Sequence, residues 1–222
     1  TYAKSMVVRF NACLKDIVIS TLDIIGAIPD EQPVVYPSPA SARYERNKLR
    51  LSDIQSIQGN DDSDDLNFVA NYLQERLVER FGVELPISEA GDYTISLEIC
   101  QDIKEEGYKV RVKNDGVKLS ASKRLSLLYA AETLVQLCES GEIQVCEIED
   151  HPYRPIRGFH FGLPPREEIE FAKKLIRYVL IPMRYNMLII EFAGGMRFDR
   201  HPEISEAWVQ GNRAAKAGTQ PP

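Results

Sequence analysis

Two of the three histidines, His160 and His201, are side chains whose type suits acid-base catalysis or metal binding at neutral pH. An imidazole needs a partner for either task, such as a second ligand a few positions away on the same helix face. Neither histidine has a partner at ligand spacing, and the chain contains no His-Glu-x-x-His pattern. The sequence therefore favours ordinary polar positions for both, and no metal site is predicted from them.

Two further patterns could bind ions or phosphate. The acidic run 61–65 lacks the alternating oxygen ligands, central glycine and closing glutamate of a calcium loop, and it is typical of the start of a helix. Gly194 and Gly195 lack the lysine-serine or GxGxxG context of a phosphate-binding loop, so a tight turn after a strand is expected there. The sequence predicts no metal and no cofactor.

The four cysteines have no metal-type spacing and lie among apolar neighbours. Small buried hydrophobic residues are the favoured interpretation. A disulfide between Cys138 and Cys146 stays open, because a helix-to-strand return can bring two such positions together. Cysteine usage therefore leaves the cellular compartment open. The four are Cys13, Cys100, Cys138 and Cys146.

The composition is that of a globular protein, with 44% hydrophobic and 27% charged residues among 222. The formal net charge of −6 argues against broad attraction to nucleic acid or anionic lipid. The basic residues of 43–50 are interrupted by an acid and predict a solvated strand face. Asp16 and Asp23 interrupt the apolar stretch 16–28, so no membrane span is predicted. The chain starts without methionine or a leader, and we expect any export signal to be absent or removed.

Residues 31–150 alternate between strand and helix patterns. Strict alternation predicts strands over 93–99, 107–113 and 117–121, with a hairpin turn at 114–116. Apolar residues at helical spacing predict helices from the acidic run to Gly82 and over 122–139, the second ended by Gly141. A short strand over 143–148 follows. These elements predict an α+β domain, a mostly antiparallel sheet with two helices on one face.

The flanking segments read differently. Residues 1–30 are uncertain, although β-branched residues in 6–10 and 17–22 favour strands. In 151–222, a strand at 158–161, a helix over 166–180 and an apolar strand at 187–190 predict one βαβ unit. Such a unit cannot bury both faces alone, so it resembles the opening of a larger α/β structure that is truncated here. The tail from Gly211 reads as a cut loop.

The order of four motifs resembles the family 20 glycoside hydrolases, the β-N-acetylhexosaminidases, over about residues 34–204. The motifs are Tyr-Pro-Ser-Pro at 36–39, Glu-Gly-Tyr-Lys-Val at 106–110, the Thr-Leu-Val-Gln-Leu helix within 126–137, and Ile-Glu-Asp-His-Pro-Tyr-Arg-Pro-Ile-Arg-Gly at 148–158. The resemblance implies a small α+β domain before a (β/α)₈ barrel, with 151–222 as its truncated start. It also implies that the full-length parent is an enzyme, while this fragment alone is inactive.

The resemblance implies a definite chemistry for that parent. Family 20 enzymes release terminal β-linked N-acetylhexosamine by substrate-assisted retention, in which the substrate's acetamido oxygen attacks the anomeric carbon. In an adjacent Asp-Glu pair, the aspartate orients the acetamido group and the glutamic acid protonates the leaving oxygen. No position of this chain matches the pair, so no catalytic residue is assigned here.

Two residues are candidates for substrate binding, one through the resemblance and one through its position on a predicted strand. Arg157 matches an arginine on the first barrel strand that binds sugar hydroxyls, and its guanidinium offers a fixed fork of donors. A structural ion pair is the alternative role for Arg157. Glu191, at the end of the second strand, is the weaker candidate. The segments 159–164 and 190–197 lack polar residues usual in the family, which suggests a divergent branch.

Other functions share these features. Family 84 O-GlcNAc hydrolases and family 67 α-glucuronidases have a similar small domain before a barrel. A non-catalytic carbohydrate-binding or assembly module is the alternative from another class. The expected partner is an oligosaccharide or glycan, with no nucleic acid and no membrane, and the oligomeric state stays open. The resemblance favours an extracytoplasmic setting, periplasmic or secreted.

Overall fold

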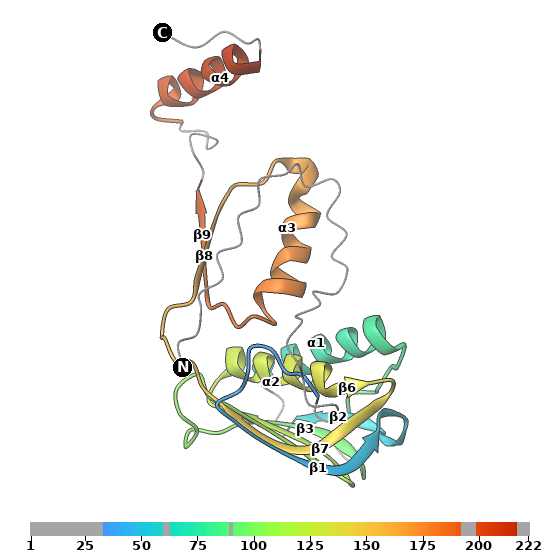
Figure 1. Cartoon of the computed structure of the whole chain (residues 1–222). Coiled ribbons are helices and arrows are strands. Elements are labelled where there is room, and N and C mark those ends of the chain that lie inside the picture. The colour runs from blue at the N-terminus through green and yellow to red at the C-terminus, as the bar shows by residue number, and fades with distance from the viewer. Residues whose placement is uncertain (1–32, 60–62, 89–90, 192–198, 217–222) are drawn as a thin grey trace. The chain divides into compact units, whose positions relative to one another are not determined.

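The computed structural model describes residues 33–59, 63–88, 91–191 and 199–216. Within these residues, a seven-stranded sheet has the order β1-β7-β4-β5-β3-β2, with β6 pairing with β7 (Figure 1). We call residues 33–150, which contain this sheet, the sheet domain. Its strands are β1 (Ser41–Arg50), β2 (Ser56–Gly59), β3 (Thr94–Ile99), β4 (Tyr108–Lys113), β5 (Gly116–Ala121), β6 (Cys138–Glu139) and β7 (Glu142–Asp150).

Most strand pairs of the sheet are antiparallel, as predicted, but two are parallel, so the sheet is mixed. β3 runs parallel to both β2 and β5, while β1, β4, β5, β6 and β7 form antiparallel pairs. The chain passes from β2 through a helix to β3, and a strand-helix-strand connection of this kind joins parallel strands. The sequence missed this because β2, with four residues, is too short to show alternation.

Two helices cover one face of the sheet, as predicted (Figure 1). α1 (Asp64–Phe81) begins at Ser63, whose Oγ accepts a hydrogen bond from the Leu66 amide at 3.4 Å. It ends at Gly82, which has a φ of 68°. α2 (Arg124–Leu137) packs beside α1 and against β4 and β5. Local capping and apolar spacing therefore suffice to define α1.

The core lies between these helices and the inner face of the sheet, while the outer face carries ion pairs. Fully buried side chains come from both layers, namely Ile57, Leu73, Ile95, Leu97, Val110, Leu119, Ala130 and Val135. On the outer face, Lys109 pairs with Glu149 at 2.6 Å and Arg111 with Glu147 at 2.5 Å. The basic residues of 43–50 lie on β1, which is mostly exposed, as expected for a solvated strand.

The end of α2 differs from the prediction. The helix stops at Leu137, Cys138 is already extended, and Gly141 (φ 80°) forms the turn between β6 and β7. Cys138 lies opposite Ile143, so Cys146 is three residues further along the strand, about 10 Å away. A disulfide cannot span that distance, and both thiols are free and buried.

The predicted strand-helix-strand unit is present after the sheet domain, and we call residues 151–191 the β8–β9 unit. β8 (Gly158–Gly162) and β9 (Met187–Glu191) pair in parallel, with Gly158 opposite Met187 and Gly162 opposite Glu191. The helix predicted over 166–180 consists of a 3₁₀ turn (Arg166–Glu168), α3 (Ile169–Leu175) and a π-helical turn (Ile176–Leu180). The sequence pattern gave the helix but not these changes in geometry.

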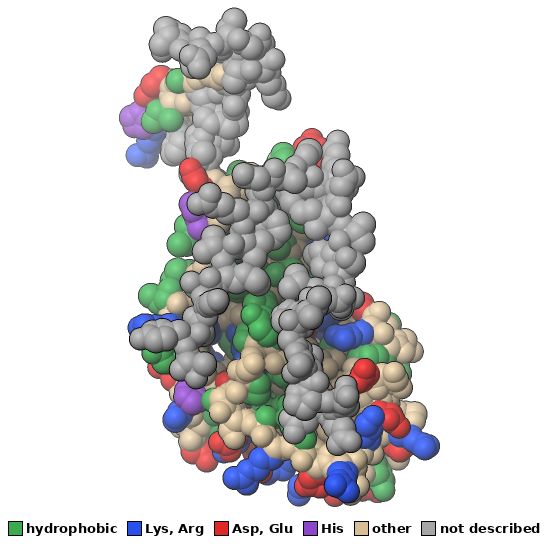
Figure 2. Space-filling view, viewed as in Figure 1, with side chains coloured by type: hydrophobic (Ala, Val, Ile, Leu, Met, Phe, Trp, Pro, Cys, Tyr) green, Lys and Arg blue, Asp and Glu red, His purple; other side chains and the backbone are tan. Residues whose placement is uncertain are grey.

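The apolar strand β9 is not covered on both sides, as predicted for a βαβ unit that cannot bury both of its faces alone. Its side chains from Met187 to Ile190 are each at least 36% exposed. Figure 2 shows hydrophobic side chains gathered over this part of the chain, whereas charges of both signs are mixed over the sheet domain. The β8–β9 unit therefore presents an apolar surface, as expected for a βαβ unit alone.

The remaining predictions concern the tail, the N-terminal segment and the turn after β9. α4 (Pro202–Lys216) extends into the tail that was expected to be a loop from Gly211. The strand segments within 1–30 and the glycine turn at 194–195 lie outside the described residues. No described helix is both long and apolar enough to cross a bilayer.

We expect Leu73→Ala to lower the free energy of unfolding by about 3 kcal/mol, because Leu73 is fully buried and its truncation leaves a cavity. Urea denaturation measures the change. Val78→Ala on the exposed side of the same helix is the control, with a change within about 0.5 kcal/mol. Equal losses in the two variants would contradict the described core.

Candidate functional site

The two residues predicted to bind substrate lie at opposite ends of the β8–β9 pair. Arg157 directly precedes β8, and Glu191 is the last residue of β9. The register places Glu191 opposite Gly162, five residues along from Arg157. At about 3.3 Å per residue, the two positions are roughly 16 Å apart. The structure therefore does not bring them together.

The Arg157 side chain is held at the junction between the sheet domain and the β8–β9 unit. Its Nη2 donates to Glu106 Oε2 at 2.5 Å, Nε donates to the Arg184 carbonyl at 2.7 Å, and Nη1 donates to the Arg154 carbonyl at 2.7 Å. The guanidinium lies 5.9 Å from the Tyr129 ring centroid. These contacts are those of the structural ion pair left open as the alternative role. The sugar-binding role stays a prediction.

Asn186 completes this arrangement, and sequence analysis did not identify it. Its Nδ2 donates to both oxygens of Glu106, each at 3.2 Å, while its Oδ1 accepts the Arg157 backbone N–H at 2.9 Å. Lys123 Nζ lies 3.1 Å from Glu106. Burial acts to raise the pKa of Glu106, but the hydrogen bonds from Arg157, Lys123 and Asn186 outweigh it and lower that pKa. Glu106 is therefore held as a carboxylate.

A second arginine, Arg184, crosses the same junction. It forms an ion pair with Asp150, and both side chains are about nine-tenths buried. The Asp150 carboxylate also accepts the Ala40 amide at 3.0 Å, and the Arg184 guanidinium lies 5.3 Å from the Tyr108 ring centroid. Burial raises the pKa of Tyr108, so its phenol stays protonated. Arg184 has a φ of 62°, which is uncommon outside glycine.

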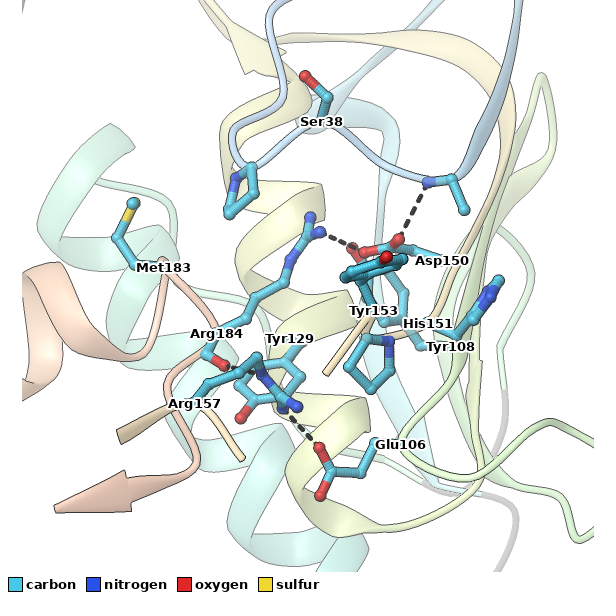
Figure 3. Close-up of a pocket in the computed structure, with 13 residues that line it drawn as sticks. Ser38, Glu106, Tyr108, Tyr129, Asp150, His151, Tyr153, Arg157, Met183 and Arg184 are labelled. Atoms are coloured by element: carbon cyan, nitrogen blue, oxygen red, sulfur yellow. Dashed lines mark hydrogen bonds and ion pairs between the residues drawn. The ribbon is translucent and has the colours of Figure 1, made fainter. Parts of the chain in front are cut away.

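A cavity of about 350 Å³ lies at these two ion pairs (Figure 3). In Figure 3 the Arg184–Asp150 pair and the Arg157–Glu106 pair both border it. Each charge faces an opposite one, so the cavity has no excess of either sign. Its walls are mainly aromatic and apolar. The lining residues are Pro37, Ser38, Ala40, Glu106, Tyr108, Tyr129, Asp150, His151, Pro152, Tyr153, Arg157, Met183 and Arg184.

Glu191 has a different environment at the other end of the strands. Its Oε2 lies 3.4 Å from His160 Nε2, and both side chains are more than half exposed. An exposed carboxylate beside an imidazole can accept hydrogen bonds from hydroxyl groups. Among the described residues, no group of three histidines, cysteines or acids could hold a metal ion.

A buried ion pair also joins the two helices of the sheet domain. Glu132 on α2 accepts hydrogen bonds from Arg76 Nε and the Tyr72 hydroxyl on α1, both at 2.7 Å. Burial raises the pKa of Tyr72, and the Glu132 carboxylate beside it acts in the same direction. The hydroxyl therefore stays protonated and remains a donor to Glu132.

A third arginine of the β8–β9 unit reaches the sheet domain through α1. Arg177 Nη2 donates to Glu75 at 2.8 Å and to Glu79 at 3.0 Å. Arg177 lies in the π-helical turn, whose wider geometry changes the direction of its side chains relative to an α-helix. The junction thus has three arginines on one side and carboxylates on the other.

Sequence reasoning did not identify Glu106, Asp150, Arg184 and Asn186, which form the ion pairs and hydrogen bonds of this junction. Glu106 and Asp150 both stood within the motifs that carried the resemblance, but their partners lie 51 and 34 residues away in sequence. A single sequence has no signal for pairing over such separations. The sequence also does not predict the positive φ of Glu106, which is 55°.

Comparison with known families now identifies the sheet domain. Residues 32–151, more than half of the chain, match the profile of glycosyl hydrolase family 20, domain 2. The chain belongs to glycosyl hydrolase family 20. The suspected resemblance is thereby confirmed. A comparison with curated protein sequences gave no match.

Solved structures agree with the family at the level of the fold. An exo β-N-acetylglucosaminidase from Vibrio harveyi, in complex with N-acetylglucosamine, aligns with a TM-score of 0.62 at 22% identity over 73% of this chain and 26% of its own. An N-acetyl-β-hexosaminidase from Streptomyces plicatus aligns with a TM-score of 0.60 at 24% identity, over 73% of this chain and 34% of its own. A β-N-acetylhexosaminidase from Bacteroides fragilis aligns with a TM-score of 0.61 at 19% identity, over 78% of this chain and 37% of its own. The chain thus spans about a quarter to a third of their length.

We expect Glu132→Gln to destabilise the family 20 sheet domain by about 3 kcal/mol, because it leaves the buried Arg76 charge without its main partner. Denaturant unfolding measures the loss. Glu149→Gln, which breaks the exposed pair with Lys109, is the matched control, with an expected change below about 1 kcal/mol. If Glu132→Gln lowered the free energy of unfolding as little as Glu149→Gln, the result would contradict the burial of the Arg76–Glu132 pair.

The lowered pKa of Glu106 predicts a pH dependence of stability. A carboxyl group whose pKa is lowered on folding stabilises the native state above its ordinary pKa of about 4.3, and the contribution disappears as the pH falls through the lowered value. We expect wild type to exceed Glu106→Gln in unfolding free energy from about pH 5 to 7, with the difference shrinking below about pH 4. Urea unfolding across this range measures it. A difference that persists unchanged to pH 3 would rule this assignment out.

Proposed function

We propose that this chain is the N-terminal part of a glycoside hydrolase that releases terminal β-linked N-acetylhexosamine from glycans by substrate-assisted retention. Membership of family 20 is the observation that carries the proposal. The printed names of the similar structures, β-N-acetylglucosaminidase and β-N-acetylhexosaminidase, support the sugar. In this proposal, domain 2 precedes a catalytic domain that begins within residues 151–222.

The β8–β9 unit supports a barrel as that catalytic domain. Parallel strands are normally covered on both faces, yet Met187 to Ile190 are exposed among the described residues. Further strands and helices would cover them. A (β/α)₈ barrel takes about 250 residues, far more than the residues 151–222 provide. The first two strands of such a barrel are the proposed identity of β8 and β9.

The proposal places the chemistry outside this chain. An adjacent Asp-Glu pair would be needed at the carboxyl end of a later strand, where barrel active sites are built. The 222 residues alone are therefore expected to be inactive. A binding module without turnover is the alternative that this expectation has to be tested against.

Glu191 and Arg157 enter the proposal with different support. Glu191 ends β9 and is exposed, as a substrate-facing residue at the carboxyl rim should be. Arg157 lies at the amino end, and its guanidinium is bound by Glu106 and two backbone carbonyls. A sugar-binding role for Arg157 would require some of these contacts to be exchanged for substrate hydroxyls.

Activity of the natural full-length protein tests the proposal. We expect it to release nitrophenol from p-nitrophenyl β-N-acetylglucosaminide, and residues 1–222 to release none. O-GlcNAc-modified peptide and an α-glucuronide are assayed in parallel, because exclusive turnover of either would replace the proposal with the corresponding alternative glycosidase. Glycan binding without turnover of any substrate would favour the binding module.

Substitutions in the active full-length protein separate the two residue roles. We expect Glu191→Gln to lower kcat/KM at least about tenfold with little change in melting temperature, because an exposed side chain adds little stability. Arg157→Lys keeps the charge but loses the fork of donors. A raised KM at unchanged melting temperature would support substrate binding by Arg157, whereas a lowered melting temperature at unchanged KM would support the structural ion pair.

A further inference from the structure

The residues that directly precede β8 and β9 are joined through one carboxylate of the sheet domain. Glu106 accepts hydrogen bonds from the side chains of Arg157, which precedes β8, and Asn186, which precedes β9. Asn186 also accepts the Arg157 amide, and the amides of Asn186 and Met187 both point to the Arg157 carbonyl, at 3.0 and 3.3 Å. We call Glu106, Arg157 and Asn186 the Glu106 network. It closes on itself at the point where the two strands begin to pair.

The sequence of β9 does not define its own register. Side chains alternate across a strand, so a slip by one residue is normally prevented because it exposes apolar groups and buries polar ones. Residues 187–190 are all apolar, and a slip by one would exchange apolar for apolar. The Glu106 network supplies what the strand lacks, since a slip of about 3.3 Å would carry Asn186 out of hydrogen-bond reach of Glu106.

Glu106 is itself held rigidly. Its backbone has a φ of 55°, and the following Gly107 has no room for a side chain, because an added Cβ would lie 2.8 Å from the Lys104 carbonyl. Lys123 pairs with the same carboxylate from the start of α2. Uncommon backbone geometry of this kind persists only where surrounding contacts determine it. The carboxylate is therefore a fixed point of the sheet domain.

We propose that Glu106 is a positioning residue that sets the register between β8 and β9. In this register, Glu191 lies opposite Gly162 at the carboxyl end of the pair. The sheet domain would thus act as a template for the first two strands, from the end opposite to the substrate. The consequence for catalysis rests on the proposed function, whereas the register itself does not.

Hydrogen exchange of the 222-residue chain tests the register. We expect Glu106→Gln to lower protection of the amides in 158–162 and 187–191 at least about tenfold, with the amides of α1 and β3 changed less than about threefold. Glu147→Gln, an exposed ion-paired acid on the outer sheet face, is the matched control and should change neither group.

A double-mutant cycle shows whether Glu106 acts through Asn186. If it does, Glu106→Gln should have little further effect on β8–β9 protection in an Asn186→Ala background, because the two changes break one network. Additive effects would overturn the proposal, as would unchanged protection in Glu106→Gln. Equal loss of protection throughout the sheet domain would also overturn it, since Glu106 would then be a general stability residue.

A second cycle, in the full-length protein, addresses catalysis. If Glu106 positions Glu191, the effect of Glu106→Gln on kcat/KM should largely vanish in a Glu191→Gln background. If Glu106→Gln only impairs folding, its effect on kcat/KM should add to that of Glu191→Gln. A full-length protein that turns over no sugar would refute the proposed function. If Glu106→Gln still changed hydrogen exchange in β8 and β9 of that protein, the register proposal would remain supported. Additive kinetic effects would refute the link to Glu191.

Discussion

A buried carboxylate has to keep a cation or several hydrogen-bond donors beside it, and this requirement governs how the described residues are arranged. Glu132, Asp150 and Glu106 all lie on the sheet domain with little exposure, and each is paired with an arginine. Removing water from such a group costs several kcal/mol unless the pairing is good. Two of the three arginines, Arg157 and Arg184, come from the β8–β9 unit. The sheet domain on its own would therefore leave Glu106 and Asp150 without their arginine partners.

The pairing divides the β8–β9 unit into two ends with different properties. The amino ends of the strands are bound to the sheet domain through hydrogen bonds of low exposure, and the carboxyl end carries the exposed pair of His160 and Glu191. In α/β barrels, conserved groups at the amino end serve stability and those at the carboxyl end serve chemistry. The proposed identity of β8 and β9 as barrel strands gives a reason for this division.

Backbone geometry of low probability occurs at the same junction. Glu106 and Arg184 both have positive φ, and each contributes one charged partner to an ion pair across it. The π-helical turn brings a third arginine, Arg177, to α1. Two of the four described non-glycine residues with positive φ thus lie among the residues that join the two parts, where many contacts compensate for the cost.

Local patterns in the sequence determined much of the sheet domain. Ser63 and Gly82 bound α1 because capping involves only neighbouring backbone groups, and the strands at 93–121 follow from alternation. The order of the four motifs at 36–39, 106–110, 126–137 and 148–158 indicated family 20. Tertiary structure alone decided that β3 is parallel to its neighbours and that Arg157 binds Glu106, 51 residues away. It also put Arg157 and Glu191 at opposite ends of one strand pair. Periodicity records which face a residue takes within its own element, whereas strand direction and ion pairing depend on how distant elements are brought together.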